Sequence, residues 1–286
     1  MNKEINIAYS PDSDDLFMFY AVLENKINTY GYTFNCVTND TEQLNMNALN
    51  SNTIDITAIS IHNYAYLADR YLMLPHGGSV GNNYGPVVVA KDEFPIESLK
   101  NKTIAIPGLR TTAYLVLKLI ISEFEPNVVP IEPFMKIFDE IESGNVDAGL
   151  VIHEGRLTYP SYGMKKIVDI GEWWHEHYKL PLPLGGNVIR KDLGNDTVKE
   201  VSEILRESIR YALDHKEEVM DYIIANDPRP QNVLLNRQML EEYLNMYANE
   251  QTFDYGGDGQ KAIQVLLDKG YQKDIIPHAT KVEFAP

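Results

Sequence analysis

Short runs of apolar and β-branched residues alternate with helical patterns along the first hundred residues. In the helical patterns the apolar residues recur at i, i+3, i+4 and i+7, as on one face of an amphipathic helix. The patterns predict strands at 5–8, 33–37, 54–59 and 86–90, and helices at 13–23, 41–49 and 64–72. Strands that alternate with helices of about ten residues indicate βαβ units and a mostly parallel sheet.

The same alternation starts again after Pro95. It predicts strands at 103–106, 128–131 and 146–152, and helices at 111–124 and 134–142. Residues 7–16 resemble residues 104–113 at an offset of 97, and residues 49–55 resemble residues 141–147 at an offset of 92. A duplicated α/β unit accounts for both offsets, although unrelated βαβ units also resemble one another by chance.

The last third of the chain has a helical pattern. Apolar stripes follow one another at 198–209, 233–247 and 262–267. Just before them, Gly185–Arg190 has the pattern of a strand that returns to the first unit. We therefore expect an α/β protein with two lobes and a ligand cleft between them. Lobe one comprises residues 1–91 and 188–286, including the C-terminal helices, and lobe two comprises residues 92–187.

Composition narrows the classes of partner. The 286 residues include 25 Lys and Arg against 41 Asp and Glu, a net charge of −16. This charge argues against nucleic acid or an anionic membrane surface as a partner. It does not exclude a small anionic substrate, which backbone amides at a helix start can hold. With no apolar run of about 18 residues, no apolar segment near the N-terminus and a single cysteine, Cys36, the chain is expected to be cytoplasmic.

Ligands of open α/β sheets bind beyond the carboxyl ends of the strands. That rule selects three places in this chain: Ala58, Ile59 and Ser60, the pair Thr111 and Thr112, and His153. Ser60 is a candidate to hold a ligand and also to cap the next helix, and the two roles are compatible. The threonine pair opens an apolar helix, where its hydroxyls either cap the helix or form an anion pocket with the first amides. The corresponding Asp14 and Asp15 would repel an anion, so the anion is expected at lobe two.

His153 follows the apolar run 146–152. Histidine titrates near neutral pH and is the commonest general base, so a histidine at the cleft edge is a candidate for proton transfer. The other histidines have no ligand spacing typical of a metal site, and the sequence has neither a phosphate-binding loop nor a dinucleotide fingerprint. We therefore expect neither a metal nor another cofactor.

Two lobes, a crossover return and a helical C-terminal part resemble the type II periplasmic binding protein fold. Several segments also resemble a cytoplasmic enzyme family that uses this fold, the 1,4-dihydroxy-6-naphthoate synthases of the futalosine route to menaquinone. These segments are Ser10–Phe17, Gly85–Ala90, Pro107–Gly108, Thr111–Tyr114, Gly149–Glu154, Arg156–Pro160, Trp173–Trp174 and Leu180–Gly185. The family often has Pro-Asn-Asp-Thr where this chain has Ser13–Leu16, so the resemblance assigns no role to Asp14.

The resemblance implies a carbon–carbon lyase. Such an enzyme converts cyclic dehypoxanthine futalosine to 1,4-dihydroxy-6-naphthoate and dihydroxyacetone. It implies His153 as the proton acceptor, and Ala58–Ser60 and Thr111–Thr112 as substrate-binding segments. Two alternatives stay open. A solute-binding protein would share the fold but would be expected to carry an export signal. Chorismate dehydratase of the same pathway would share the fold, but it would not be expected to carry the motifs at Val151–Glu154 and Leu180–Gly185 together.

Overall fold

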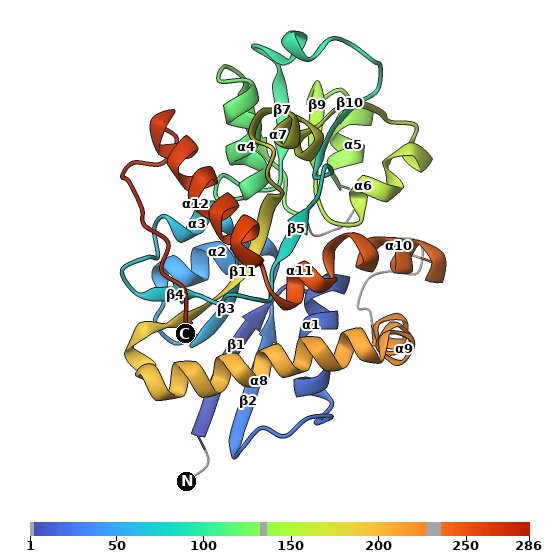
Figure 1. Cartoon of the computed structure of the whole chain (residues 1–286). Helices are drawn as coiled ribbons and strands as arrows, with labels where there is room; N and C mark the ends of the chain where they lie inside the picture. The colour runs from blue at the N-terminus through green and yellow to red at the C-terminus, as the bar shows by residue number, and fades with distance from the viewer. Residues whose placement is uncertain (1–2, 132–135, 227–235) are drawn as a thin grey trace.

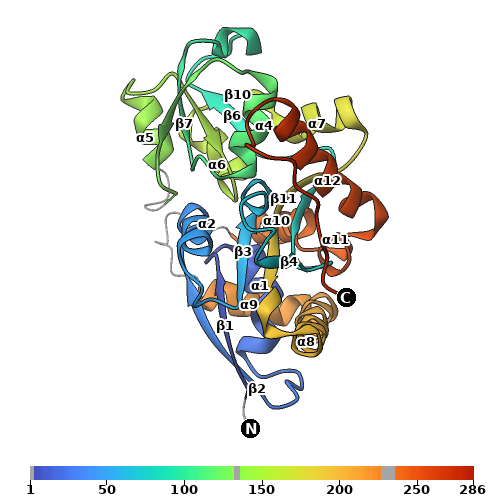
Figure 2. The same cartoon turned by 90° about the vertical axis from the view of Figure 1, so that its left-hand side faces the viewer.

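The computed structural model describes residues 3–131, 136–226 and 236–286. Two β-sheets lie one above the other, each flanked by helices (Figures 1 and 2). The first sheet contains β1 (Lys3–Tyr9), β2 (Tyr32–Thr38), β3 (Ile56–Ser60), β4 (Tyr71–Met73), β5 (Ser79–Gly81) and β11 (Leu182–Arg190). The second sheet contains β6 (Val87–Ala90), β7 (Thr103–Ile106), β8 (Glu125–Val128), β9 (Ala148–Val151) and β10 (Lys165–Asp169). We call the first sheet with its helices lobe one, and the second lobe two.

The helices cover both sheets. They are α1 (Ser13–Leu23), α2 (Thr41–Asn50), α3 (Ile61–Tyr64), α4 (Thr112–Ile120), α5 (Lys136–Glu142), α6 (Gly155–Thr158), α7 (Ile170–Tyr178), α8 (Asn195–Asp214), α9 (Lys216–Asn226), α10 (Arg237–Tyr247), α11 (Glu250–Phe253) and α12 (Gly256–Gln272). None of the described helices is both long and apolar enough to cross a membrane.

The two sheets have the same strand order. It is β2-β1-β3-β11-β4 in lobe one and β8-β7-β9-β6-β10 in lobe two. Within each sheet the first three strands are parallel and the fourth is antiparallel to the third. The sequence repeat therefore corresponds to a structural repeat.

The repeat extends to the register of the strands. Ile7 pairs with Ile56 in lobe one, and Ile104 pairs with Ala148 in lobe two, so the offsets of 97 and 92 both hold. A carboxylate closes each unit in the same way: Asp55 accepts the backbone N–H of Asn6 at 2.9 Å, and Asp147 accepts that of Thr103 at 2.9 Å. Asp55, just before β3, is thus hydrogen-bonded to β1, and Asp147, just before β9, is hydrogen-bonded to β7 in the same way.

The fourth strand of each sheet comes from beyond a crossover between the lobes. β6 was predicted to lie in lobe one, but it pairs with β9 and β10 in the second sheet. β11 begins at Leu182, inside the range predicted for lobe two, and pairs with β3 in the first sheet. Each of the two strands therefore belongs to the sheet of the other lobe than its position in the chain predicts. Each runs antiparallel to the third strand of that sheet.

The C-terminal helices pack mainly on lobe one. Helix α1 is buried on nearly every side because α8, α9 and α10 cover the faces that the sheet leaves open. Helix α12 contacts α3 and β11 but also α4 of lobe two, so it bridges the lobes (Figure 1). The prediction that these helices pack on lobe one is therefore incomplete for α12.

Three element predictions differ from the structure. The helix predicted at 64–72 is wrong: α3 ends at Tyr64, and the chain turns before β4 begins at Tyr71. The apolar spacing reflects inward-facing residues in turns, since Tyr64, Leu67 and Tyr71 are all buried. Helix α4 ends at Ile120, before its predicted end at 124, and β8 precedes its predicted position. Parts of the predictions at 134–142 and 233–247 lie outside the described residues.

Candidate active site

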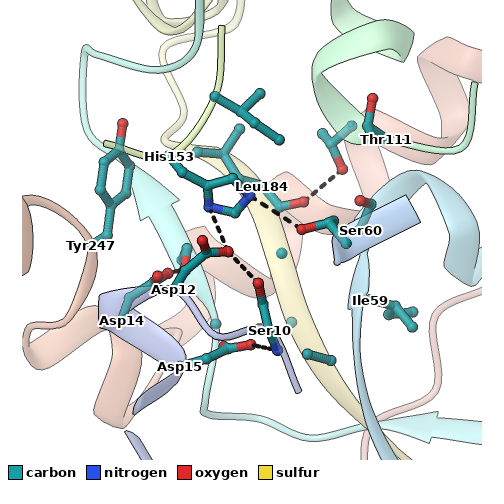
Figure 3. Close-up of a pocket in the computed structure, with 18 of the residues that line it drawn as sticks. Ser10, Asp12, Asp14, Asp15, Ile59, Ser60, Thr111, His153, Leu184 and Tyr247 are labelled. Carbon is teal, nitrogen blue, oxygen red and sulfur yellow. Dashed lines mark hydrogen bonds and ion pairs between the residues drawn. The ribbon is translucent and has the colours of Figure 1, made fainter. Parts of the chain in front are cut away.

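A cavity that is partly open to solvent lies between the lobes. All six residues selected from the sequence line it: Ala58, Ile59, Ser60, Thr111, Thr112 and His153. The carboxyl ends of β3 and β9 and the start of α4 meet there, as the strand-end rule predicts. Figure 3 shows His153 on one side of this space, with Ser60 and Thr111 across from it.

His153 has a backbone conformation that few side chains adopt. Its φ of 51° lies in the left-handed region, which costs energy for residues other than glycine and is least unfavourable for Asn, Asp and His. The residue lies two positions after the end of β9, and its side chain is 18% exposed. This turn directs the ring away from lobe two and toward lobe one, where Figure 3 shows it facing Asp12.

Both ring nitrogens of His153 have partners in lobe one. Nδ1 lies 3.0 Å from Oδ2 of Asp12, and Nε2 lies 3.1 Å from the hydroxyl of Thr41 at the start of α2. A carboxylate beside Nδ1 favours the tautomer with its proton there, which leaves the lone pair on Nε2. Nε2 is therefore the basic nitrogen, and it accepts from the Thr41 hydroxyl.

Asp12 was missed by the sequence reasoning, although it lies inside Ser10–Phe17. It occupies the N-cap position of α1, yet its side chain makes no hydrogen bond to the helix. The carboxylate instead faces His153 and accepts the hydroxyl hydrogen of Ser10. Burial raises the pKa of Asp12 to about 6, and the nearby His153 acts against this rise. An unused cap and a buried carboxylate beside an imidazole indicate a functional group.

Asp14 and Asp15 are buried under the cavity. Asp14 accepts from the hydroxyls of Tyr243, at 3.1 Å, and Ser79. Asp15 accepts the backbone N–H of Ser10 at 2.7 Å. Burial raises the pKa of Asp14, and burial together with the charge of Asp14 raises that of Asp15 well above its ordinary value. A cluster of three buried carboxyls favours the protonated forms, which reduces the repulsion of an anion that the sequence predicted.

The Asp15→Asn variant is expected to be more stable than the wild type at pH 7. A raised folded-state pKa means that ionisation at pH 7 disfavours the fold, and the amide removes that cost. The difference in unfolding free energy should shrink as the pH falls toward 4, because the wild-type carboxyl then binds its proton in both states. Urea unfolding of both proteins at pH 7, 6, 5 and 4 measures it.

Comparing variants is necessary here because other groups titrate in the opposite sense. Burial lowers the pKa of His62 and His76 to about 4, so acidification weakens the fold through them in the same range. Asp69→Asn is the matched control, since the Asp69 side chain is 79% exposed. A pH-independent difference for Asp15→Asn, equal to that of the control, would contradict a raised pKa.

Ser60 has partners on α2. Its hydroxyl accepts from the amide of Asn45 at 3.1 Å, and its backbone N–H donates to the same side chain at 2.9 Å. Ser60 occupies the N-cap position of α3, as the capping interpretation predicts, but its side chain makes no cap hydrogen bond. Its hydroxyl hydrogen remains available to the cavity, which Ala58 and Ile59 line from the same strand end.

The two threonines have different roles. Thr111 is the N-cap of α4: its hydroxyl accepts the N–H of Tyr114 at 3.2 Å and donates to the carbonyl of Gly108 at 2.8 Å. Thr112 joins the lobes, since its hydroxyl donates to the carbonyl of Leu184 at 2.6 Å and accepts the N–H of His62 at 3.2 Å. The first amides of α4, at Thr112 and Ala113, lack carbonyl partners within the helix and line the cavity.

Replacing both threonines with valine is expected to raise KM and lower stability together. Each lost hydrogen bond is worth about 0.5–1.5 kcal/mol, and the lost cap about 1 kcal/mol. The serine pair is the control because it keeps both hydroxyls. Substrate KM and urea unfolding of the two variants separate the effects: a KM that stays at the wild-type value in the valine pair would show that the doublet is structural only.

Two further charged residues adjoin the cavity and were not selected from the sequence. Arg156 lines it, donates to Asp169 at 2.8 Å and to the carbonyl of Gly85, and is the one Arg or Lys among the cavity-lining residues described. Glu154 is buried and accepts from the hydroxyl of Ser13 at 2.8 Å, across the lobes. Both lie in segments that carry the family resemblance, which was the available signal.

Asp12, His153 and Glu154 each place one potential ligand atom within 4.8 Å of the others. These residue types can hold a metal ion. All three side chains already have partners: Asp12 interacts with Ser10 and with His153, and Glu154 accepts from Ser13. The arrangement reads as a hydrogen-bonded network that connects the lobes, and no further observation points to a metal.

Two α/β lobes with exchanged fourth strands around a ligand cavity define a periplasmic-binding-protein-like fold, as predicted. The alkanesulfonate-binding protein of Xanthomonas axonopodis pv. citri, solved with MOPS bound, has this fold: TM-score 0.70, 15% identity, 98% of this chain and 96% of that chain covered. A crystal structure of a protein from Archaeoglobus fulgidus is more similar, with a TM-score of 0.88, 41% identity and coverage of 96% and 98%.

Sequence comparison identifies the family. The model described as menaquinone biosynthesis matches residues 5–272. The 1,4-dihydroxy-6-naphthoate synthase of Thermus thermophilus is 36% identical over 266 residues, 93% of each chain. That of Streptomyces coelicolor is 31% identical over 276 residues, 96% of this chain and 95% of the relative. The chain belongs to this menaquinone biosynthesis family, which confirms the resemblance found in the sequence.

Proposed function

We propose that this protein cleaves cyclic dehypoxanthine futalosine to 1,4-dihydroxy-6-naphthoate and dihydroxyacetone. The observation that carries the proposal is the position of His153. Its basic Nε2 lies at the cavity between the lobes, and Asp12 supports the ring from the opposite nitrogen at 3.0 Å. Both relatives are named 1,4-dihydroxy-6-naphthoate synthase, and each aligns with this chain over nearly its whole length.

The reaction needs a base more than it needs any other group. His153 removes a proton from the cyclic substrate, which allows a carbon–carbon bond to break in the retro-aldol sense. The naphthalene ring becomes aromatic as the three-carbon fragment leaves, and this makes the step favourable. Asp12 stabilises the imidazolium that forms, because a buried carboxylate interacts strongly with a new positive charge beside it.

The remaining cavity groups orient the substrate. The carboxylate of the substrate fits the first amides of α4 at Thr112 and Ala113, where the helix dipole favours negative charge. Ser60 supplies a hydroxyl to a carbonyl or hydroxyl of the ligand. Arg156 supplies positive charge at the cavity wall. Because His153 meets Asp12 and Thr41 across the lobe interface, the complete base exists only when the lobes are together.

The direct test uses purified protein and cyclic dehypoxanthine futalosine. We expect naphthoate absorbance to appear together with one equivalent of dihydroxyacetone, without added metal or nucleotide. Chorismate is the control substrate, since the related dehydratase acts at the start of the same pathway. Binding of the cyclic compound without turnover would indicate a solute-binding protein, and consumption of chorismate would indicate the dehydratase; either outcome contradicts the proposal.

A further inference from the structure

Helices α3, α4 and α12 pack against one another (Figure 1). A second groove is lined by residues of α3, α4 and the segment that follows α12, and none of its lining residues belongs to the active-site cavity. Lobe one contributes His62 and Tyr66 to its walls. Lobe two contributes Arg110, Tyr114 and Lys118, and Lys273 comes from the end of α12. We call it the His62 groove.

The His62 groove is cationic in a strongly acidic protein. Arg110, Lys118 and Lys273 line it, against one carboxylate, Asp274. Within residues 3–131, 136–226 and 236–286, none of these three cations forms an ion pair. In a chain of net charge −16, three unpaired cations around one depression create a local attraction for an anion.

His62 provides a second, independent feature of the groove. Its Nδ1 lies 3.2 Å from the carbonyl of Thr111, which places the ring proton on that nitrogen. The other nitrogen, Nε2, is buried and has no hydrogen-bond partner among the described residues. Burial lowers the pKa of His62 to about 4, so the ring is neutral at pH 7 and Nε2 is an unused acceptor. Buried polar atoms in native proteins nearly always have a partner, and this one needs a donor.

Aromatic rings complete the walls. The guanidinium of Arg110 lies 3.8 Å from the centre of the Tyr66 ring, and Tyr114 lines the same groove from α4. Flat ligands pack favourably on such rings and on a stacked guanidinium. Cations, a hydrogen-bond acceptor and aromatic faces together select for one kind of molecule.

We propose that the His62 groove binds a small aromatic acid that carries a hydroxyl group. The carboxylate interacts with the cations at Arg110, Lys118 and Lys273. The hydroxyl donates to Nε2 of His62 once the ligand displaces the side chains that shield this nitrogen. A ligand held by walls from both lobes stabilises the arrangement of the lobes seen in this structure.

The groove and the active site share a wall. The backbone N–H of His62 donates to the hydroxyl of Thr112, and its ring contacts the carbonyl of Thr111; both threonines line the active-site cavity. A ligand in the groove therefore acts on the substrate-binding end of α4, and by linkage substrate and groove ligand affect each other's affinity. If the proposed function holds, the product is itself a hydroxylated aromatic acid, so its accumulation would hold the lobes together and slow release.

Calorimetry of the full chain with 6-hydroxy-2-naphthoate tests the groove without any need for turnover. We expect two binding events per chain in the wild type. The Lys118→Gln/Lys273→Gln variant should weaken one of them at least tenfold and leave the other unchanged. Lys199→Gln/Lys261→Gln is the matched control, because it alters net charge equally at exposed lysines outside the groove. A single event, or two events that the groove variant leaves unchanged, would overturn the proposal.

The coupling is tested by kinetics with the same probe. In the wild type, 6-hydroxy-2-naphthoate should lower kcat, and this effect should disappear in Lys118→Gln/Lys273→Gln but persist in the lysine control. Purely competitive inhibition in all three proteins would overturn the coupling. Calorimetry decides the groove even if the protein does not turn over the proposed substrate, so the two proposals fail separately.

Discussion

The His153→Asn variant is expected to turn over substrate about 10²–10⁴ times more slowly than the wild type, the usual contribution of a positioned base. Asparagine is the appropriate replacement because position 153 has a φ of 51°, which asparagine tolerates better than alanine. The fold should survive, since the side chain lies at a cavity edge. KM should change far less than kcat, because Ser60 and the start of α4 still hold the substrate.

Steady-state kinetics and circular dichroism of the purified variant measure these effects. Thr41→Val is a useful companion, because it removes the hydroxyl at 3.1 Å from Nε2 and leaves the histidine in place. It should lower kcat much less than His153→Asn does. Near-wild-type turnover in a folded His153→Asn protein would exclude histidine as the base and direct attention to another cavity group.

The Asp12→Asn variant is expected to lower kcat by about 10²–10⁴-fold although Asp12 need not touch the substrate. The amide cannot stabilise the imidazolium by charge, and it can present its NH₂ group to Nδ1, which favours the wrong tautomer. The stability of the fold should not fall, because a buried carboxylate is removed along with its desolvation cost. Kinetics together with urea unfolding separate these effects.

The pH profile distinguishes a positioning role of Asp12 from a structural one. Because burial raises the pKa of Asp12 to about 6, wild-type kcat should fall as the pH decreases through that range, when the carboxylate beside His153 becomes protonated. Asp12→Asn should displace this limb, because the limb belongs to the coupled pair of Asp12 and His153 and only one member of the pair remains. Asp15→Asn is the matched control, since Asp15 is equally buried and contacts the backbone of Ser10 instead of His153. Equal loss of kcat in both variants would contradict a specific role for Asp12.

The two substitutions should also be non-additive. His153→Asn/Asp12→Asn is expected to be no slower than His153→Asn alone, because a carboxylate that acts through the histidine has nothing to support once the histidine is gone. Independent, additive losses would indicate that Asp12 acts directly on the substrate.

The sequence alone determined the repeat and its register. Strand and helix periods are local properties, so the offsets of 97 and 92 could be measured without any structure, and the pairs Ile7–Ile56 and Ile104–Ala148 follow them. The positions at the strand ends were equally local. For this reason His153, Ser60 and the threonines could be selected from the sequence, and all of them line one cavity.

Local patterns could not predict the secondary structure where the same apolar spacing fits both a helix and a set of buried turns. The spacing of Tyr64, Leu67 and Tyr71 fits a helix face, but the residues are buried from turns and a strand. Chain order likewise could not assign β6 and β11 to a sheet, because each strand pairs after a crossover and the pairing depends on the other lobe.

Only the tertiary structure decided what surrounds His153. Its partners Asp12 and Thr41 lie in lobe one, 141 and 112 positions away, so no periodicity or motif spacing connects them to it. The sequence presented Asp14 and Asp15 as charges that would repel an anion, whereas packing of α1 against α8 and α10 buries them and raises their pKa values. Protonation and hydrogen bonding depend on neighbours that are distant in the sequence: packing within lobe one buries the two aspartates, and His153 meets its partners only where the two lobes come together.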